Sequence, residues 1–401
     1  MDIFCDYLIV GAGVIGLTLA RELIIKNPDA KIIVLEKEKS IGMHASGRNS
    51  GVLHTGIYYP ANTLKSKFCK LGADLLFQYA NEHDISVRKD GKIIVATSED
   101  EISGLDQLLL NAQANNIHAE KVDGVSLREI EPFACSDFGG IHCRDTAVID
   151  SQHVLRVLLQ ELMQYGVNLL FGKKIESIND DTRELRIANE AIKFGTLINT
   201  AGSYADSVAK LVNVGMEYIL IPFKGTYYQL ADEINHRVRA SIYPVPNRNL
   251  PFLGVHFTRV IGGDVYIGPT VIPAFGRENY RLFQNIDVSE SVNIMRHLIK
   301  LYIKNTHNFR GLSKVALSHQ TKRGVVNSAR SLMPGLETSS VINSTKVGIR
   351  PQLLNTKNMT LEMDFLIKKG NNSVHVLNSI SPAFTSSFAV AKYLVNEVIT
   401  G

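Results

Sequence analysis

The chain has few cysteines, and none of them is paired in sequence. Its 401 residues include only Cys5, Cys69, Cys135 and Cys143, and no two of these form a CxxC pair. Cysteine-rich zinc sites usually contain such pairs, and disulfide frameworks are typical of short chains with many cysteines. We therefore expect four reduced thiols in a reducing compartment and no metal site.

Long apolar runs and a strong charge of one sign are absent too. No apolar run approaches the ~20 residues that a membrane-spanning helix needs, and no signal peptide precedes the first predicted strand. The formal net charge of +4, with scattered basic residues, argues against nucleic acid as a partner. The sequence thus predicts a cytoplasmic protein. Peripheral contact with the inner face of a membrane stays open.

The chain also lacks internal repeats, low-complexity segments, an HExxH metal-binding sequence and a Gly-x-Ser-x-Gly nucleophile turn. Hydrophobic residues make up 45% and charged residues 20%, which is typical of a globular chain with ample core. The length predicts two domains, or one nucleotide-binding domain with a large insertion.

The first forty residues have the element order of a dinucleotide-binding unit. An apolar strand over residues 7–10 leads into the turn GAGVIG (11–16), and an apolar helix follows to about Ile25. A second strand over residues 31–35 ends at Glu36. The Glu36 carboxylate would accept hydrogen bonds from ribose hydroxyls and would repel a 2′-phosphate. A purely structural tight turn is the alternative.

Each glycine of this turn has a physical role. Gly11 permits the tight turn, Gly13 lets the backbone approach a pyrophosphate, and Gly16 lets the helix pack close to the strand. The helix N-terminus, at Val14 and Ile15, offers free N–H groups and a positive dipole end to phosphates.

Three further segments look suited to a long polar cofactor. Residues 41–56 are irregular and rich in glycine and small polar donors, and so long a loop beside a nucleotide fold suggests binding. Residues 196–206 read as a strand that breaks at Gly202 before a helix. Residues 373–378 read as a buried strand before a helix that opens at residues 385–387. That helix start would stabilise the negative edge of a reduced flavin, or it is an ordinary capped helix.

These patterns predict an α/β (α+β overall) fold of two interleaved domains. A Rossmann-like nucleotide-binding domain would combine residues 1–80, 145–215 and 345–401. Residues 84–144 and 216–344 are β-rich and would form a substrate domain with a mixed or antiparallel sheet.

Helical patterns occur within the second domain at residues 99–115 and 288–304. We expect the apolar face of the latter to pack in the core, with a membrane-surface role as the alternative. Its residues are Val292, Met295, Leu298, Ile299 and Ile303.

The chain from about residue 3 to 398 resembles the FAD-dependent D-amino-acid-oxidase-like oxidoreductases. Within them it looks most like the L-2-hydroxyglutarate dehydrogenases/oxidases. The matching stretches are HASGRNSGVLHTGIYYP (44–60), PFKGTYYQL (222–230), PFLGVHFTRVIGGDVYIGPT (251–270), FGRENY (275–280), VGIR (347–350) and SPAFTSSFAVA (381–391). Thr226 stands where the family usually has an acidic residue, and Thr270 replaces the usual asparagine after Gly-Pro. Pro351 and the following loop also differ from the common pattern.

The resemblance implies noncovalent FAD and oxidation of a 2-hydroxy acid, most closely L-2-hydroxyglutarate to 2-oxoglutarate. The carbon that bears the hydroxyl would give hydride to flavin N5 while a histidine takes the hydroxyl proton. A quinone, another carrier or dioxygen would then accept the electrons. The predicted cofactor residues are Gly11, Gly13, Val14, Ile15, Gly16, Glu36, Lys37, His44, Ser46, Gly47, Asn49, Ser50, Gly51, Ile175, Ala201, Gly202, Thr385, Ser386 and Ser387.

Two histidines and one arginine are the predicted catalytic residues. His54 lies in the glycine-rich loop, His256 lies in a strand of the substrate domain, and Arg350 is a candidate clamp for the C1 carboxylate. A structural histidine or a surface ion pair is the plainer interpretation of each. The predicted substrate-binding residues are Tyr58, Lys224, Thr258 and Arg277, and Arg259 is a further candidate.

Three other functions stay open on the sequence. The same fold would serve oxidation of glycerol-3-phosphate or an amino acid. A noncatalytic flavin-binding protein would bind FAD without being reduced by a substrate. An NAD-dependent dehydrogenase would be colourless, but residues 42–56 and the C-terminal strand disfavour it.

Overall fold

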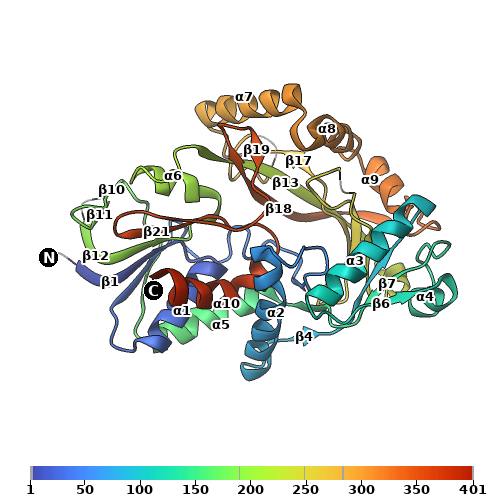
Figure 1. Ribbon diagram of the computed structural model, residues 1–401, viewed down its shortest axis with the longest axis horizontal. Helices are drawn as coiled ribbons and strands as arrows, with labels where there is room; N and C mark the ends of the chain where they lie inside the picture. Colours follow the sequence, from blue (N-terminus) through green and yellow to red (C-terminus); the bar gives the residue numbers. More distant parts are fainter. Residues whose placement is uncertain (1–2, 189, 248, 282–283, 400–401) are drawn as a thin grey trace.

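The computed structural model describes residues 3–188, 190–247, 249–281 and 284–399. It contains two large sheets that lie side by side, each with helices on its outside (Figure 1). Both ends of the chain lie in the same half of the molecule, beside the smaller of these sheets.

The smaller sheet has eight strands and a parallel centre. Its strands β12, β1, β2 and β9 pair side by side in parallel, and β21 adds to β12. All four residues of β2 are buried, as expected for a strand covered on both faces. The strands are β1 (Ile3–Val10), β2 (Ile32–Leu35), β9 (Asn168–Leu170), β10 (Ser177–Asn179), β11 (Glu184–Ile187), β12 (Glu190–Asn199), β20 (Leu366–Lys369) and β21 (Ser373–Asn378).

Helices from distant parts of the chain cover one face of this sheet. α1 (Val14–Lys26) packs against α5 (Ser151–Gln164) and α10 (Ala383–Tyr393), and α10 packs against α2 (Leu64–Glu82). A single apolar core joins residues of all four helices to the sheet. α10 continues into a π-helical turn, Leu394–Ile399.

The larger sheet has ten strands and is mostly antiparallel. Its order is β19-β18-β13-β16-β15-β14-β5-β7-β6, with β17 on β13. The bounds are β5 (Lys92–Val95), β6 (Glu120–Val122), β7 (Gly140–Cys143), β13 (Tyr218–Leu230), β14 (Ser241–Pro244), β15 (His256–Arg259), β16 (Val265–Gly268), β17 (Ile272–Pro273), β18 (Val341–Asn355) and β19 (Thr360–Leu361).

The remaining elements connect and cover these sheets. A third, three-stranded sheet is formed by β3 (Val52–Leu53), β8 (Ala147–Ile149) and β4 (Val87–Arg88). Its strands lie where the chain passes from one large sheet to the other. The other helices are α3 (Ile102–Ala114), α4 (Gly124–Ile130), α6 (Ala205–Lys210), α7 (Val288–Lys304), α8 (Phe309–Ser318) and α9 (Lys322–Ala329). The short 3-10 helices are Glu99–Glu101, Gly202–Tyr204, Asp232–Arg237 and Thr306–Asn308.

One strand departs from the predicted division of the chain. The sequence analysis assigned residues 345–401 to the nucleotide-binding domain. However, β18 pairs along most of its length with β13 in the ten-stranded sheet. The C-terminal stretch joins the eight-stranded sheet only at β20 and β21. The other predicted domain limits stay predictions.

Helix α7 forms where the periodicity predicts it, but the predicted buried face is wrong. Ile294, Leu298 and Leu301 are its buried residues, and their i, i+4, i+7 spacing is that of one helix face. Of the predicted face, only Leu298 is buried. The exposed fractions of the other four are 64% for Val292, 40% for Met295, 51% for Ile299 and 65% for Ile303.

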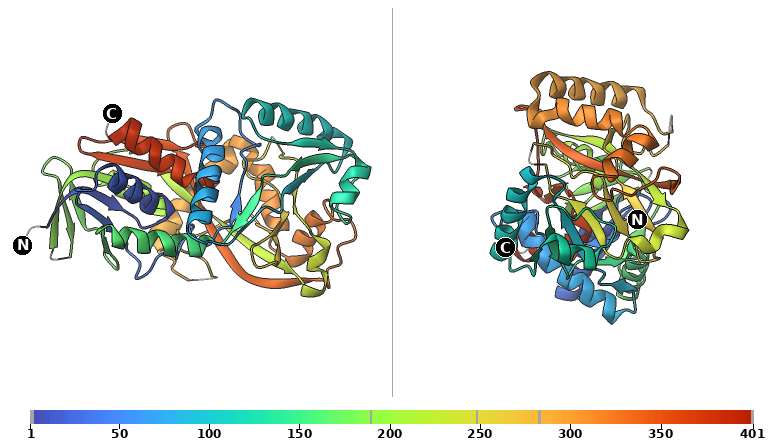
Figure 2. Two further views of the ribbon diagram at one scale, coloured as in Figure 1. Left: turned by 90° about the horizontal axis from the view of Figure 1, so that it is seen from below. Right: turned by 90° about the vertical axis from the view of Figure 1, so that its right-hand side faces the viewer.

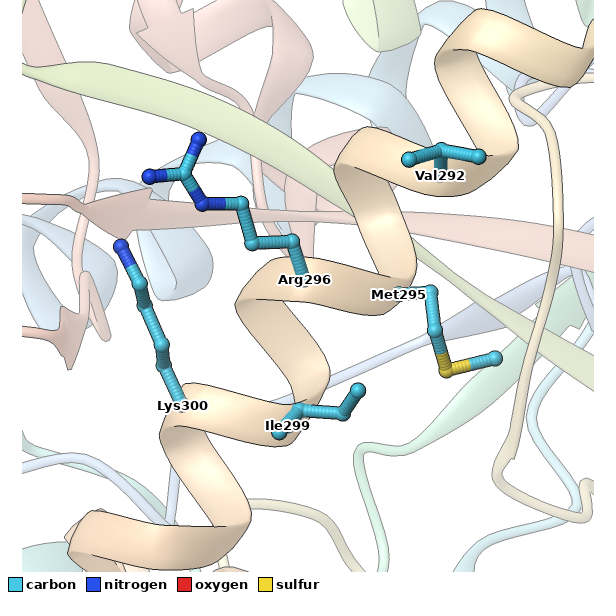
Figure 3. Close-up of a pocket in the computed structure, with 5 residues that line it drawn as sticks. All are labelled: Val292, Met295, Arg296, Ile299 and Lys300. Carbon is cyan, nitrogen blue, oxygen red and sulfur yellow. The ribbon is translucent and has the colours of Figure 1, made fainter.

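The exposed face of α7 combines apolar and basic side chains. Val292, Met295 and Ile299 line an open hollow of about 450 Å³ together with Arg296 and Lys300 (Figure 3). Successive residues of a helix are about 100° apart around its axis. Arg296 and Lys300 therefore lie next to the apolar residues, on one side of them. Within the described residues, no helix has both the length and the apolar content to cross a bilayer.

Candidate active site

The glycine-rich turn is crowded by the end of a neighbouring strand. Gly11 has φ +105°, and a Cβ there would lie 2.7 Å from the carbonyl oxygen of Thr200, just beyond β12. A Cβ on Gly16 would lie 2.0 Å from the carbonyl oxygen of Gly11. Only glycine therefore fits at either position, and the turn lies directly beside residues 200–202.

The irregular loop 41–56 contacts the same turn. The backbone N–H of Val14 donates to Ser46 Oγ at 2.9 Å, next to Gly13. Asn49 then holds the loop through hydrogen bonds to Ser46 O at 2.6 Å and from Gly51 N at 2.8 Å. The loop thus presents the Ser46 hydroxyl to the start of α1.

The start of α10 approaches the loop from the other end of the chain. The backbone N–H of His54 donates to Thr385 Oγ1 at 3.3 Å, and that hydroxyl donates to the carbonyl of Val52 at 3.1 Å. Ser386 Oγ and Ser387 Oγ are buried and have no hydrogen-bond partner among the described residues. Two donors are therefore left for a ligand where the three segments meet.

The predicted ribose-binding acid already holds the backbone beside the turn. Glu36 accepts hydrogen bonds from the backbone N–H of Ala12 at 3.0 Å and of Glu38 at 2.9 Å. Both interactions keep its carboxylate at the C-terminal end of β2. This is the sheet edge where open α/β sheets bind nucleotides.

Lys37 and His44 belong to an ion-pair cluster rather than to a bare loop. The ammonium of Lys37 pairs with Glu38 and Glu278, and His44 contacts Tyr280 Oη at 2.8 Å. Glu38, His44 and Glu278 are close enough to share a metal ion. Because the Lys37 ammonium already pairs with both carboxylates, we assign the group as an ion-pair cluster.

The other predicted cofactor residues lie around the same edge. Gly47 O accepts from Gln152 Nε2 at 3.1 Å, and Ser50 is half-buried. Ala201 N donates to Asn199 Oδ1 at 3.1 Å, and Gly202 has φ +55°. Ile175 differs, because it packs against the apolar core of the sheet.

Sheet register places two of the substrate-domain candidates, His256 and Thr258, on one face of the ten-stranded sheet. Tyr243 on β14 lies beside His256 on β15, and Ser241 lies beside Thr258, because Ile242 pairs with Phe257. The rings of Tyr243 and His256 stack with centroids 4.0 Å apart. The ring of His54 meets Tyr243 edge-on at 6.5 Å. The ring of Tyr243 therefore lies next to both predicted catalytic histidines.

Both histidines are held neutral. Burial lowers the pKa of His54 to about 3, and the charges of Lys92, His256 and Arg350 add to the effect. Burial and the charges of Arg350 and Lys92 likewise lower the pKa of His256 to about 3. His256 Nδ1 lies 2.8 Å from the carbonyl oxygen of Gly254. A carbonyl only accepts, so Nδ1 carries the proton and Nε2 keeps a free lone pair.

Arg350 provides positive charge near these rings. It lies on β18 opposite Phe223, and its guanidinium is 5.8 Å from the ring of Phe252. Among the described residues, no hydrogen bond or ion pair engages that guanidinium. Its charge acts on both histidines and on Tyr243. The geometry therefore offers an anion-binding arginine beside two neutral histidines.

The sequence pattern of the FAD dependent oxidoreductase (DAO) family matches residues 6–397. The chain belongs to this family. It is 34% identical to the mitochondrial L-2-hydroxyglutarate dehydrogenase of Caenorhabditis briggsae, over 98% of this chain and 93% of that protein. It is 31% identical to the L-2-hydroxyglutarate dehydrogenase of Escherichia coli K12, over 98% and 93%.

Solved structures show the same fold for this FAD-dependent oxidoreductase. L-alpha-glycerophosphate oxidase from Mycoplasma pneumoniae with FAD bound has a TM-score of 0.78 at 21% identity, covering 98% of this chain and 94% of that one. Glycine oxidase from Geobacillus kaustophilus has a TM-score of 0.72 at 15% identity, covering 98% and 94%. The family membership and the Rossmann-like fold predicted from the sequence are confirmed.

FAD is the cofactor of this oxidoreductase, and the residues present fit it. The glycine-only turn at Gly11, the helix start behind Gly13 and the carboxylate of Glu36 match a dinucleotide. The partnerless hydroxyls of Ser386 and Ser387 match a second polar group near the start of α10. The alternative of an NAD-dependent dehydrogenase without flavin is therefore wrong.

The structure gives Arg277 and Lys224 other partners. The Arg277 guanidinium forms buried ion pairs with Asp206 and Glu290, which indicates a scaffold role and does not support substrate binding. Lys224 Nζ donates to Asn279 Oδ1 at 3.0 Å. Arg259 Nη1 donates to Val238 O at 2.7 Å.

Two of the three departures from the family pattern, Thr226 and Thr270, contact each other. Thr226 Oγ1 and Thr270 Oγ1 are 2.8 Å apart, and the backbone N–H of Thr226 also donates to Thr270 Oγ1 at 3.0 Å. A hydrogen-bonded pair of threonines thus stands where the family usually has an acidic residue and an asparagine. The two changes compensate each other locally, so neither leaves an unpaired polar group.

The sequence analysis missed Lys92, which opens β5. Its side chain is 0% exposed and, among the described residues, its ammonium has no hydrogen-bond partner. The ammonium lies 4.5 Å from the ring centre of Tyr58 and 5.2 Å from that of Tyr243. The signal in the sequence was a lysine directly before the buried run Ile93-Ile94-Val95.

Proposed function

We propose that this FAD-dependent enzyme oxidises a 2-hydroxy acid, with L-2-hydroxyglutarate as the substrate and 2-oxoglutarate as the product. The names of its curated relatives support the substrate. The observation that carries the proposal is local. Arg350, whose guanidinium has no hydrogen bond or ion pair among the described residues, lies close enough to His54 and His256 for its charge to act on both, and both histidine rings contact the ring of Tyr243.

In the proposed reaction, the protein binds an acid and removes a proton. Arg350 holds the carboxylate next to the reacting carbon through charge-assisted hydrogen bonds. His256 accepts the hydroxyl proton at Nε2, because its Nδ1 proton is held by Gly254 O. FAD supplies the acceptor for the hydride that leaves the same carbon. Loss of H⁺ from oxygen and H⁻ from carbon leaves the C=O bond of the 2-oxo acid.

Binding of an acidic substrate would also tune the base. In the free site, the charges of Lys92 and Arg350 add to burial in lowering the pKa of both histidines. A bound carboxylate neutralises those charges and so raises the histidine pKa towards the range where a base is efficient. Proton removal is thereby coupled to occupancy of the site.

The exposed face of α7 supports peripheral contact with an anionic lipid surface. Val292, Met295 and Ile299 form an apolar sector flanked by Arg296 and Lys300 (Figure 3). This arrangement is typical of helices that lie in the bilayer interface. Such contact would bring the enzyme to a membrane quinone, the acceptor that we favour over a soluble carrier or dioxygen.

The purified protein should be yellow, and L-2-hydroxyglutarate should bleach the flavin absorbance without oxygen. Glycerol-3-phosphate, L-amino acids and the D-enantiomer serve as comparison substrates in the same anaerobic assay. Faster bleaching by any of them would overturn the substrate assignment. A flavin that none of them reduces would support the noncatalytic alternative.

Arg350→Ala and His256→Gln should slow flavin reduction by roughly two or more orders of magnitude while FAD stays bound, because each removes a group that acts on the reacting carbon. His54→Ala tests the second histidine in the same way. Near-normal reduction in a variant that retains FAD would remove that residue from the mechanism.

A further inference from the structure

A lysine without a counter-ion lies inside the ten-stranded sheet. Lys92 is fully buried, and none of the described residues offers its ammonium a hydrogen-bond acceptor. Burying an ammonium that lacks an acceptor is costly, and buried charges in proteins are normally paired. The contrast within this molecule is Arg277, which is buried between Asp206 and Glu290.

Aromatic rings replace the missing counter-ion only in part. The ammonium faces the rings of Tyr58 and Tyr243 at 4.5 and 5.2 Å, and such cation–π contacts stabilise a charge without accepting its three N–H bonds. The hydroxyl of Tyr58 is also buried without a partner among the described residues. The Lys92 ammonium and the Tyr58 hydroxyl are therefore two polar groups, on side chains in contact, that lack a hydrogen-bond partner among the described residues.

The position of Lys92 links it to the proposed reaction site. Lys92 pairs with Ser241, and Ile94 pairs with Tyr243, so alternation along the strands puts Lys92 and Tyr243 on one face. Tyr243 in turn stacks on His256. The ammonium is thus separated from the proposed base by one tyrosine ring, whereas Arg350 comes from a different strand, β18.

The surroundings also distinguish Lys92 from Lys346, a lysine that lies over two other tyrosine rings. The ammonium of Lys346 lies 4.7 Å from the ring of Tyr266 and 5.9 Å from that of Tyr227,, and its residue is only half-buried. Asp264 also acts on its charge. Lys346 is therefore partly exposed to solvent and lies near a carboxylate. Lys92 has neither solvent nor a carboxylate of the described residues to accept its hydrogen bonds.

We propose that Lys92, together with the hydroxyl of Tyr58, binds the distal carboxylate of a 2-hydroxy dicarboxylate while Arg350 binds the carboxylate beside the reacting carbon. This inference rests on the proposed function for the role of Arg350. With Lys92 in this role, the enzyme binds a substrate with two carboxylates more tightly than a substrate with one.

The test compares Lys92→Met with the wild-type holoenzyme. Glutarate is the dicarboxylate probe and butyrate the monocarboxylate probe, and their dissociation constants are measured from changes in the flavin spectrum. We expect Lys92→Met to weaken glutarate binding on the order of 10- to 100-fold, the loss of one charge-assisted contact. Butyrate binding should change by less than about threefold.

Stability separates this role from a merely structural one. Removing an unpaired buried charge should leave the Tm of the ligand-free protein unchanged or higher, and it should abolish the rise in Tm that glutarate gives the wild type. A fall in Tm with unchanged glutarate affinity would overturn the proposal. So would an equal loss of affinity for both probes.

Lys346→Met is the matched control, because Lys346, like Lys92, is a lysine whose ammonium lies over two tyrosine rings. Selective loss of glutarate binding in Lys346→Met, with normal binding in Lys92→Met, would overturn the assignment of Lys92. These binding measurements need no turnover. If no 2-hydroxy acid reduces the wild-type flavin, the proposed function fails while the result for Lys92 still stands.

Discussion

At the scale of single residues, this site depends on two histidines, His54 and His256, that burial and nearby cations keep neutral. His256 is 6% exposed, and its neutral form is favoured by burial and by two nearby cations. A neutral histidine is ready to accept a proton without first losing one. The same environment has a measurable cost in acid, because the unfolded chain can protonate this group freely.

The pKa of His256, lowered from 6.5 to about 3, predicts the direction of a pH effect. Below pH 6.5 the unfolded state binds a proton that the folded state does not, so folding stability falls as pH falls towards the folded pKa. The slope is about 1.4 kcal/mol per pH unit for such a group. Urea unfolding of the wild type should therefore show a loss of about 2 kcal/mol from this residue between pH 6.5 and 5.

His256→Phe should remove that part of the loss, and His118→Phe should not, since the His118 side chain is 90% exposed. The same shift predicts that flavin reduction by free enzyme and substrate has no inflection near pH 6.5. An inflection there that His256→Phe or His256→Gln abolishes would contradict a buried, neutral base.

At the scale of elements, the cofactor site depends on how closely two helices approach. A Cβ on Gly72 of α2 would lie 2.5 Å from Thr385 O and 2.6 Å from Ser386 Cα at the start of α10. Gly72 therefore sets the position of the helix start that carries the partnerless serine hydroxyls. Neither helix could take this position with a side chain between them.

Gly72→Ala should separate α2 from α10 and lower the free energy of unfolding by about 1–3 kcal/mol, the usual cost of overpacking. Because α10 carries Ser386 and Ser387, FAD should also dissociate more readily, as measured by flavin fluorescence on dilution. Gly335→Ala is the control, because a Cβ there meets nothing within 4 Å. Equal behaviour of the two variants would show that the close approach does not hold the cofactor site.

At the scale of the whole molecule, the proposed membrane contact of the exposed face of α7 can be tested with lipid vesicles. Flotation with phosphatidylglycerol vesicles should recover the wild type at low salt, with less recovered at high salt and little with phosphatidylcholine. The double variant Val292→Asp, Ile299→Asp should lose this binding. Leu110→Asp with Val125→Asp is the matched control, because both side chains are exposed elsewhere.

A second copy of the chain is the other occupant that this face could bind. Sedimentation analysis of the same variants distinguishes the two cases. A wild-type dimer that Val292→Asp dissociates, without any vesicle binding, would overturn the membrane contact.

The local elements could be predicted from the sequence because neighbouring residues determine them. The strand, turn and helix around Gly11 follow from apolar periodicity and glycine positions, and α7 and β21 have the predicted bounds. His54, His256 and Arg350 were singled out by the segments that carry them, in part through the family resemblance.

Contacts between distant segments were decided only by the tertiary structure. The exposed stripe of α7, the membership of β18 in the ten-stranded sheet and the ion pairs of Arg277 each depend on which surface packs against which. Lys92 shows the same limit, because a lysine in a sequence is normally solvated and only packing makes it a buried cation. Periodicity reports that a residue lies on a face, whereas the partner of that face comes from elsewhere in the chain.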